Sequence, residues 1–184
     1  DKMSAINVKS EIGPLKKVLL HRPGNELLNL TPDTLGRLLF DDIPFLPVAQ
    51  AEHDEFARIL KENGIEVVYL EDLMAEVLNI SDEILCEFIK EFIYEAGITT
   101  PKYKNLVFEY LHSFVDKKEL VLKTMSGIKI EEIPRVKREV EKSLVDFVSD
   151  ESEFLADPIP NLYFTRDPFA SCGNGAILNK MYSV

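Results

Sequence analysis

The chain has 184 residues, a mass of 21.0 kDa, a formal net charge of −11 and a pI near 4.8. Because an acidic chain with only short basic runs lacks a face that contacts phosphates, we expect no nucleic-acid partner. No apolar run approaches the roughly 18 residues of a membrane span, and the N-terminal residues do not resemble a signal peptide, so we expect no membrane association and a cytoplasmic location.

Residues 1–75 are predicted to begin an α/β domain. The apolar stretch 15–20 is typical of a strand, and the turn residues HRPG at 21–24 close it. Thr31 followed by proline is typical of a helix N-terminus, since threonine can cap the first turn and proline has no amide hydrogen to leave unpaired. That helix is expected to continue to about Phe40.

A second helix and a second strand are predicted next. From Val48, apolar residues recur at helical spacing, and they include Phe56, Ile59 and Leu60. The dipeptide Asn63-Gly64 is typical of a helix end. The apolar run 65–70 has the length of a strand. The order strand, helix, helix, strand predicts a layered α/β fold.

Residues 76–154 are predicted to form an all-helical insertion. Ser81 can cap a helix whose first turn is acidic, and apolar residues then recur every three or four positions until Gly97. These residues are Ile84, Leu85, Phe88, Ile89, Phe92 and Ile93. Three further helical segments are predicted, at 101–114, 117–125 and 135–147.

Residues 155–184 are predicted to return to the first domain. The aromatic and β-branched residues of 161–165 are typical of a strand, and 175–182 is predicted to form another, with Asn174-Gly175 as a tight turn. The second strand pattern is still running at the last residue. We therefore expect a chain that is truncated in a strand and is a fragment of a longer protein.

The cysteines and histidines are scattered along the sequence. Cys86 and Cys172 have no C-x-x-C spacing, which favours reduced thiols over a disulfide framework or a structural zinc site. His21, His53 and His112 are also far apart in the sequence. The pattern therefore gives little support to a metal site.

A carboxylate follows the predicted strand 161–165, within the stretch NLYFTRDPF. This carboxylate belongs to Asp167, and Arg166 and Pro168 beside it end the strand pattern. The residue types alone are equally consistent with structural roles. Asp-Pro commonly starts a loop and aspartate can cap its own backbone, Phe164 is typical of a core, and Asn161 is typical of a strand start or a turn.

Three sequence blocks together carry a resemblance to a known family. They are SEIGPLKKVLLHRPG at 10–24, LLFDDIPFLPVAQAEHDEF at 38–56 and PNLYFTRDPFASCGNG at 160–175. In this order, with a helical stretch between the second and third, they resemble the N-terminal half of an arginine deiminase. The resemblance implies a partial pentein-type α/β propeller, built of ββαβ blades around a pseudo-fivefold axis and carrying an all-helical insertion.

The resemblance also implies a reaction and roles for four residues. The reaction is hydrolysis of L-arginine to L-citrulline and ammonia through a cysteine-linked amidino intermediate, without cofactor or metal. Asp167 matches the aspartate that accepts two parallel hydrogen bonds from the guanidinium, which makes it both a catalytic and a substrate-binding residue. Asn161 and Phe164 match residues that contact the amino-acid portion and the aliphatic stem. Leu39 matches a leucine that reaches the pocket.

The resemblance further implies that the catalytic set is incomplete in this chain. The family's nucleophilic cysteine, its histidine acid/base and its second guanidinium-binding carboxylate belong to its second half, so we expect this polypeptide alone to form no citrulline. Cys172 is interpreted as a small structural residue, and His21 and His53 as structural. We expect a homo-oligomer.

Two alternatives stay open. Dimethylarginine hydrolases and amidinotransferases belong to the same superfamily, although they usually lack a long helical insertion. A non-catalytic arginine-binding or partner subunit would keep a guanidinium half-site without the nucleophile. Arginine titration calorimetry separates this last alternative, because a half-site with one water-exposed carboxylate should bind weakly or not at all.

Overall fold

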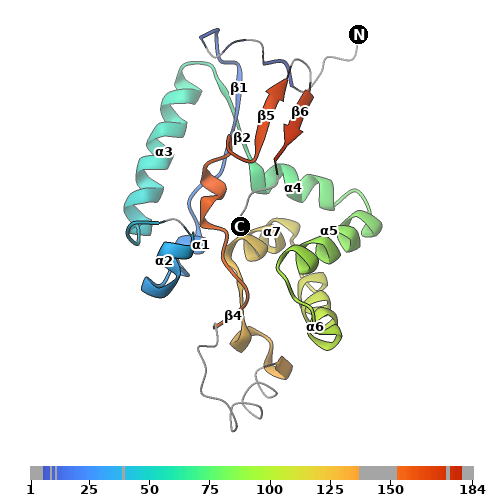
Figure 1. Ribbon diagram of the computed structural model, residues 1–184. Coiled ribbons are helices and arrows are strands. Elements are labelled where there is room, and N and C mark those ends of the chain that lie inside the picture. The colour runs from blue at the N-terminus through green and yellow to red at the C-terminus, as the bar shows by residue number, and fades with distance from the viewer. Residues whose placement is uncertain are drawn as a thin grey trace. The chain divides into compact units, whose positions relative to one another are not determined.

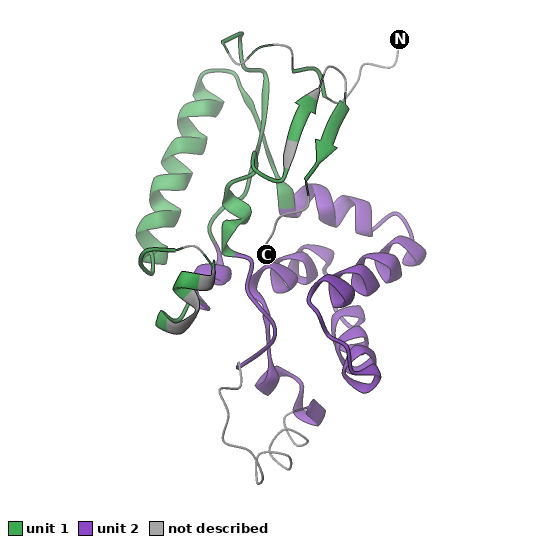
Figure 2. Cartoon of the chain, viewed as in Figure 1, with its two compact units in different colours: residues 1–23, 30–70, 160–184 green, residues 24–29, 71–159 purple. Residues whose placement is uncertain are grey.

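The computed structural model describes residues 6–8, 10, 12–38, 40–136, 153–172 and 175–179. Helices and short strands occur together, which makes this a mixed α/β chain, as predicted (Figure 1). The chain divides into two compact units: unit 1 contains residues 1–23, 30–70 and 160–184, and unit 2 contains residues 24–29 and 71–159 (Figure 2). Within the described ranges, no helix has the length and apolar character needed to cross a membrane.

Unit 1 contains a parallel strand pair joined by a helical connection. Strand β1 (Lys17–Leu20) pairs with β2 (Glu66–Tyr69) in a register that aligns Lys17 with Glu66. A parallel pair needs a long crossover, and helices α2 (Pro32–Leu38) and α3 (Leu46–Glu62) lie in the connection. Lys17 Nζ lies 2.7 Å from Glu66 Oε1 across the two strands. The predicted strand, helix, helix, strand order is confirmed for these four elements, while a short helix that was not predicted, α1 (Asn25–Leu28), also lies between β1 and α2 in the chain.

The exposed side of α3 differs from the sequence expectation. The helix begins and ends close to the predicted residues, with Gly64 at a φ of +76° just after it. Its buried residues are Leu46 and Ala57, whereas Phe56 is 52% and Ile59 46% exposed. The apolar spacing therefore predicted the helix correctly but not which side chains the unit buries.

The C-terminal part of unit 1 corrects one predicted strand. Residues 161–165 do not form a strand, because the 3-10 helix η2 (Pro160–Tyr163) is followed by a turn at 165–168. Proline suits the first position of a helical turn, and aromatic residues form strands only where a partner strand accepts their backbone bonds. The strands here are β5 (Phe169–Cys172) and β6 (Gly175–Leu178), which pair antiparallel. The predicted strand at 175–182 is confirmed as far as residue 178, and its last residues lie outside the described ranges.

Unit 2 is built mainly of helices. Its elements are α1 (Asn25–Leu28), most of α4 (Leu70–Leu78), α5 (Asp82–Glu95), α6 (Pro101–His112), α7 (Lys117–Ser126), β3 (Ile128–Lys129), η1 (Ile130–Glu132) and β4 (Phe154–Ala156). The three predicted helices that became α5, α6 and α7 are confirmed. The sequence did not predict α1, α4 or the antiparallel pair β3–β4. Because β3 lies within residues 76–154, the predicted insertion is not all-helical. The helix predicted at 135–147 lies almost wholly outside the described residues.

The core of unit 2 follows from helical periodicity. The Ser81 hydroxyl accepts a hydrogen bond from the Ile84 amide at 3.3 Å and caps α5. On α5 the residues Leu85, Ile89 and Ile93 are buried. Helices α6 and α7 add Leu106, Val107, Leu111, Leu120, Val121 and Met125 to the buried set. Burying each such large apolar side chain stabilises a fold by about 1.5–3 kcal/mol, so unit 2 has a substantial core.

Candidate functional site

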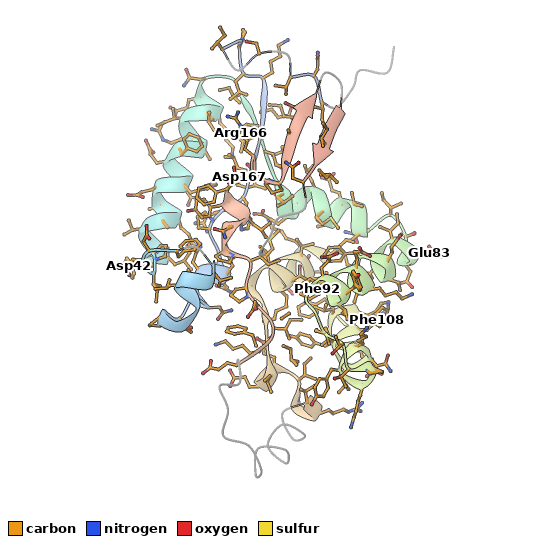
Figure 3. The ribbon with its side chains drawn as sticks, viewed as in Figure 1. Asp42, Glu83, Phe92, Phe108, Arg166 and Asp167 are labelled. Atoms are coloured by element: carbon orange, nitrogen blue, oxygen red, sulfur yellow. The ribbon has the colours of Figure 1, made fainter. Side chains whose placement is uncertain are left out.

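The segment from the start of η2 to the start of β5 carries three of the four predicted site residues. The Phe164 amide donates to the Asn161 carbonyl oxygen at 3.0 Å, and the Asp167 amide donates to the Phe164 carbonyl oxygen at 3.2 Å. These two backbone bonds fold the chain back twice within seven residues. The structure therefore brings Asn161, Phe164 and Asp167 onto one compact loop of unit 1, where Arg166 and Asp167 are labelled in Figure 3.

Two side chains attach this loop to the rest of unit 1. Asn161 Nδ2 donates to the carbonyl oxygen of Leu38 at 3.1 Å, and Thr165 Oγ1 donates to the carbonyl oxygen of Leu19 at 3.0 Å. The loop is thus held against the end of α2 and against β1. Asn161 has an anchoring role in this structure, and its contact with a substrate stays a prediction. No local sequence pattern indicates the role of Thr165, because its acceptor lies 146 positions away.

Phe164 belongs to a small aromatic group and not to a core. Its ring lies 4.0 Å from that of Tyr163, which in turn lies 6.4 Å from the ring of Phe40. Phe164 is 45% exposed, so the interpretation of this residue as a core phenylalanine is wrong. Partial burial raises the pKa of the Tyr163 hydroxyl. The loop therefore presents an apolar surface three residues before Asp167.

Asp167 is an exposed carboxylate on the turn. Within the described part of the chain its carboxylate makes no hydrogen bond or ion pair, which argues against the interpretation that it caps its own backbone. An aspartate left open in this way can accept two parallel N–H bonds from a planar cation. The remaining predicted residue, Leu39, lies outside the described residues, as does the side chain of Cys172.

The family comparison agrees with these motifs. The model of the arginine deiminase family matches residues 36–184. An arginine deiminase of Treponema denticola is 59% identical over 182 residues, which cover 99% of this chain and 44% of the relative. One of Clostridium perfringens is 56% identical over 96% of this chain and 42% of its own length, and one of Streptococcus pneumoniae serotype 19F is 56% identical over 97% and 43%. The chain belongs to the arginine deiminase family.

The resemblance drawn from the three sequence blocks is thereby confirmed. The chain spans less than half the length of the arginine deiminases just named. The first block, at 10–24, precedes the family match but lies within the aligned part of the Treponema denticola relative, which covers nearly the whole chain.

The first two arginine deiminase blocks contact each other in unit 1. The guanidinium of Arg22 donates to both carboxylate oxygens of Asp54, at 2.7 and 2.8 Å, and Gln50 Nε2 donates to the Pro23 carbonyl oxygen at 2.9 Å. The Arg22 guanidinium lowers the pKa of the Asp54 carboxyl. His21, just before Arg22, is 1% exposed. These contacts give the blocks a supporting role, since they join the end of β1 to α3.

One surface hollow of unit 1 lies away from the loop. Its lining residues lie on α3 and β2, and they are Asp54, Ala57, Arg58, Lys61, Glu62 and Tyr69. None of the predicted site residues lines it. The Asp167 loop is therefore an open feature of unit 1, and this hollow is not part of it.

Proposed function

We propose that the full-length protein to which this chain belongs hydrolyses L-arginine to L-citrulline and ammonia, and that Asp167 binds the guanidinium. The observation that carries the proposal is the exposed carboxylate of Asp167, which has no intramolecular partner among the described residues, in a member of the arginine deiminase family. The relatives are named arginine deiminases, which indicates the class of reaction. The loop carries a carboxylate, which is a group suited to binding a guanidinium substrate.

The chemistry of a guanidinium explains why a carboxylate is needed. The group is planar, permanently charged and stabilised by delocalisation, so its central carbon resists a nucleophile until the group is oriented and its charge is drawn to one side. A bidentate carboxylate fixes both the position and the plane of the group. Removing one partner of such a desolvated pair costs about 2–5 kcal/mol of binding free energy.

The other parts of the site are proposed from the family. Asn161 and Phe164 contact the amino-acid portion and stem of arginine, and Leu39 reaches the pocket. A cysteine thiolate outside this chain attacks the guanidinium carbon, a histidine protonates the leaving ammonia, and water then cleaves the carbon–sulfur bond to release citrulline and regenerate the thiolate. A second carboxylate holds the guanidinium from another direction. This 184-residue chain alone is then inactive.

The proposal extends to fold and assembly. We propose that unit 1 is part of a pentein-type propeller of ββαβ blades and that unit 2 is its inserted subdomain. The predicted boundaries at residues 75 and 154, a homo-oligomeric state, a cytoplasmic location and the absence of a nucleic-acid partner stay predictions. The parallel pair β1–β2 with its helical crossover supports the assignment of unit 1 to an α/β blade. One such pair is only part of a propeller.

The test is an Asp167→Asn substitution in the full-length protein. Asparagine keeps the shape of the side chain but cannot neutralise the guanidinium, so we expect citrulline formation to fall by at least about 30-fold, the equivalent of roughly 2 kcal/mol. Colorimetric citrulline measurement and circular dichroism report activity and fold separately.

A matched control removes a carboxylate elsewhere. Glu91 is an exposed residue of α5 in unit 2, so Glu91→Gln should keep the parental rate of citrulline formation. Unchanged turnover in Asp167→Asn would return Asp167 to a turn role. A full-length protein that binds arginine in calorimetry but forms no citrulline would instead support the non-catalytic arginine-binding alternative.

A further inference from the structure

Three side chains of types that can bind metal ions lie close together at one end of the α5–α6 helix pair in unit 2. Asp82 and Cys86 lie four residues apart on α5, and His112 is the last residue of α6. His112 Nε2 lies 3.1 Å from Asp82 Oδ1, and Cys86 Sγ lies 3.6 Å from Asp82 Oδ2. One ligand atom from each side chain lies within 4.8 Å of the other two. The sequence alone did not predict this cluster, because 26 positions separate the cysteine from the histidine.

We propose that Asp82, Cys86 and His112 form a binding site for a divalent transition-metal ion, with Zn²⁺ as the best match. Tetrahedral zinc bonds of about 2.0–2.3 Å place neighbouring ligand atoms roughly 3.3–3.8 Å apart. The 3.1 and 3.6 Å distances end on different oxygens of Asp82, but one atom from each of the three side chains lies within 4.8 Å of the other two, so small side-chain rotations bring the set to that spacing. A thiolate and an imidazole favour zinc-like ions over Mg²⁺ or Ca²⁺, which prefer oxygen ligands alone. This site is independent of the proposed arginine hydrolysis.

The two helices hold the three groups in place before any ion arrives. A spacing of four residues puts Asp82 and Cys86 on the same side of α5. The His112 ring stacks on the ring of Phe108, which lies one turn earlier on α6, with centroids 5.6 Å apart and planes at 16°. This stacking fixes the orientation of the His112 ring. Figure 3 labels Glu83 in the first turn of α5 and Phe108 on α6. The buried residues Leu85 and Leu111 belong to the same two helices.

The surroundings suit a bound cation with one open position. The Asp82 side chain is 70% and the His112 side chain 40% exposed, so a water molecule can complete a fourfold coordination from solvent. Zinc binding replaces the Cys86 thiol proton, which passes to solvent, by a sulfur–zinc bond. The ion would join the first turn of α5 to the last turn of α6. Zinc should therefore also raise the thermal stability of the protein.

The first test is a zinc titration of the full-length, metal-free protein against a chromophoric chelator. We expect Cys86→Ser and His112→Gln each to lose one bound equivalent of Zn²⁺ or to weaken its binding at least about tenfold. Cys172→Ser, which changes the chain's other cysteine, should keep that equivalent. Circular dichroism of each variant checks that the helices remain.

The second test identifies the ligand atom with cobalt. Co²⁺ in the same site should give a thiolate-to-metal absorption that disappears in Cys86→Ser and persists in Cys172→Ser. Zinc stoichiometry and affinity that are the same in the parent, Cys86→Ser and His112→Gln would overturn the proposal, as would a parent that takes up no zinc. Neither result depends on whether the protein hydrolyses arginine.

Discussion

Units 1 and 2 bury their apolar residues to very different extents. Among the described residues, the buried apolar set of unit 1 is Leu30, Leu38, Leu46 and Ala57, and all the others belong to unit 2. The exposed large apolar residues show the opposite distribution. Those of unit 1 are Val8, Ile12, Leu15, Ile43, Phe45, Val48, Phe56, Ile59, Tyr163, Phe164, Ile177 and Leu178, whereas unit 2 has Leu28, Leu73, Val77, Ile80, Tyr94 and Val115.

The difference suggests that unit 2 provides most of the stability, whereas unit 1 carries the candidate functional loop. Unit 2 closes a core from its own helices, and it should account for most of the stability of the described chain. Unit 1 carries the Asp167 loop but leaves much apolar surface in contact with water. A unit of this kind is expected to gain stability when further protein surface covers it. The loop nevertheless has a defined shape, because the bonds from Asn161 and Thr165 attach it to two elements.

The largest difference in stability should come from matched truncations in the two units. Ile89 is fully buried, so Ile89→Ala removes packed methylenes and should lower the free energy of unfolding by about 2–5 kcal/mol. Phe56 is 52% exposed, so Phe56→Ala should cost much less, below about 1 kcal/mol. Denaturant unfolding followed by circular dichroism measures both. Equal losses would contradict the view that unit 2 holds the main core.

Two glycines give a second comparison of close packing with open space. Gly127 and Gly64 follow helices at φ values of +80° and +76°. A Cβ on Gly127 would lie 2.7 Å from the backbone nitrogen of Pro158, whereas a Cβ on Gly64 would meet nothing within 4 Å. Gly127→Ala should therefore cost about 2–4 kcal/mol, from strain and overlap together, and Gly64→Ala about 1 kcal/mol from strain alone.

The readout for the glycine pair is the midpoint of denaturant unfolding. A loss for Gly64→Ala that matches that of Gly127→Ala would mean that backbone conformation alone decides the cost. It would then remove the evidence that the end of α7 packs tightly against residues 156–158.

Sequence reasoning succeeded where the signals are local. For α5, the cap at Ser81, the apolar repeat and the stop at Gly97 all lie within one short stretch, and the helix runs between them. Helix α4 was missed although Leu70, Leu73 and Val77 recur at helical spacing, because no capping residue separates it from β2.

The errors share a nonlocal cause. Residues 161–165 have strand propensity, but their bonds go to distant acceptors such as the carbonyls of Leu19 and Leu38. The spacing in α3 predicted a helix, yet exposure depends on what packs against it. The family resemblance identified Asp167, while the absence of a partner for its carboxylate within the described residues could come only from coordinates. The Asp82, Cys86 and His112 cluster likewise required the packing of two helices.

The smallest expected effect is a pH dependence at the Arg22–Asp54 pair of unit 1. The pKa of Asp54 lies below its ordinary value in the folded protein, mainly because Arg22 donates to the carboxylate, so the unfolded chain takes up the proton first as the pH falls. The stabilisation is therefore complete above the ordinary value near 3.8 and is lost as the pH drops through the lower folded value. Asp54→Asn should lower the unfolding midpoint slightly at pH 7 and make no difference at strongly acidic pH. The effect is small because the pair is exposed, and Glu91→Gln in unit 2 gives the baseline for losing a surface carboxylate. A midpoint difference that grows on acidification would have the wrong sign and would show that this ion pair does not help to hold β1 to α3.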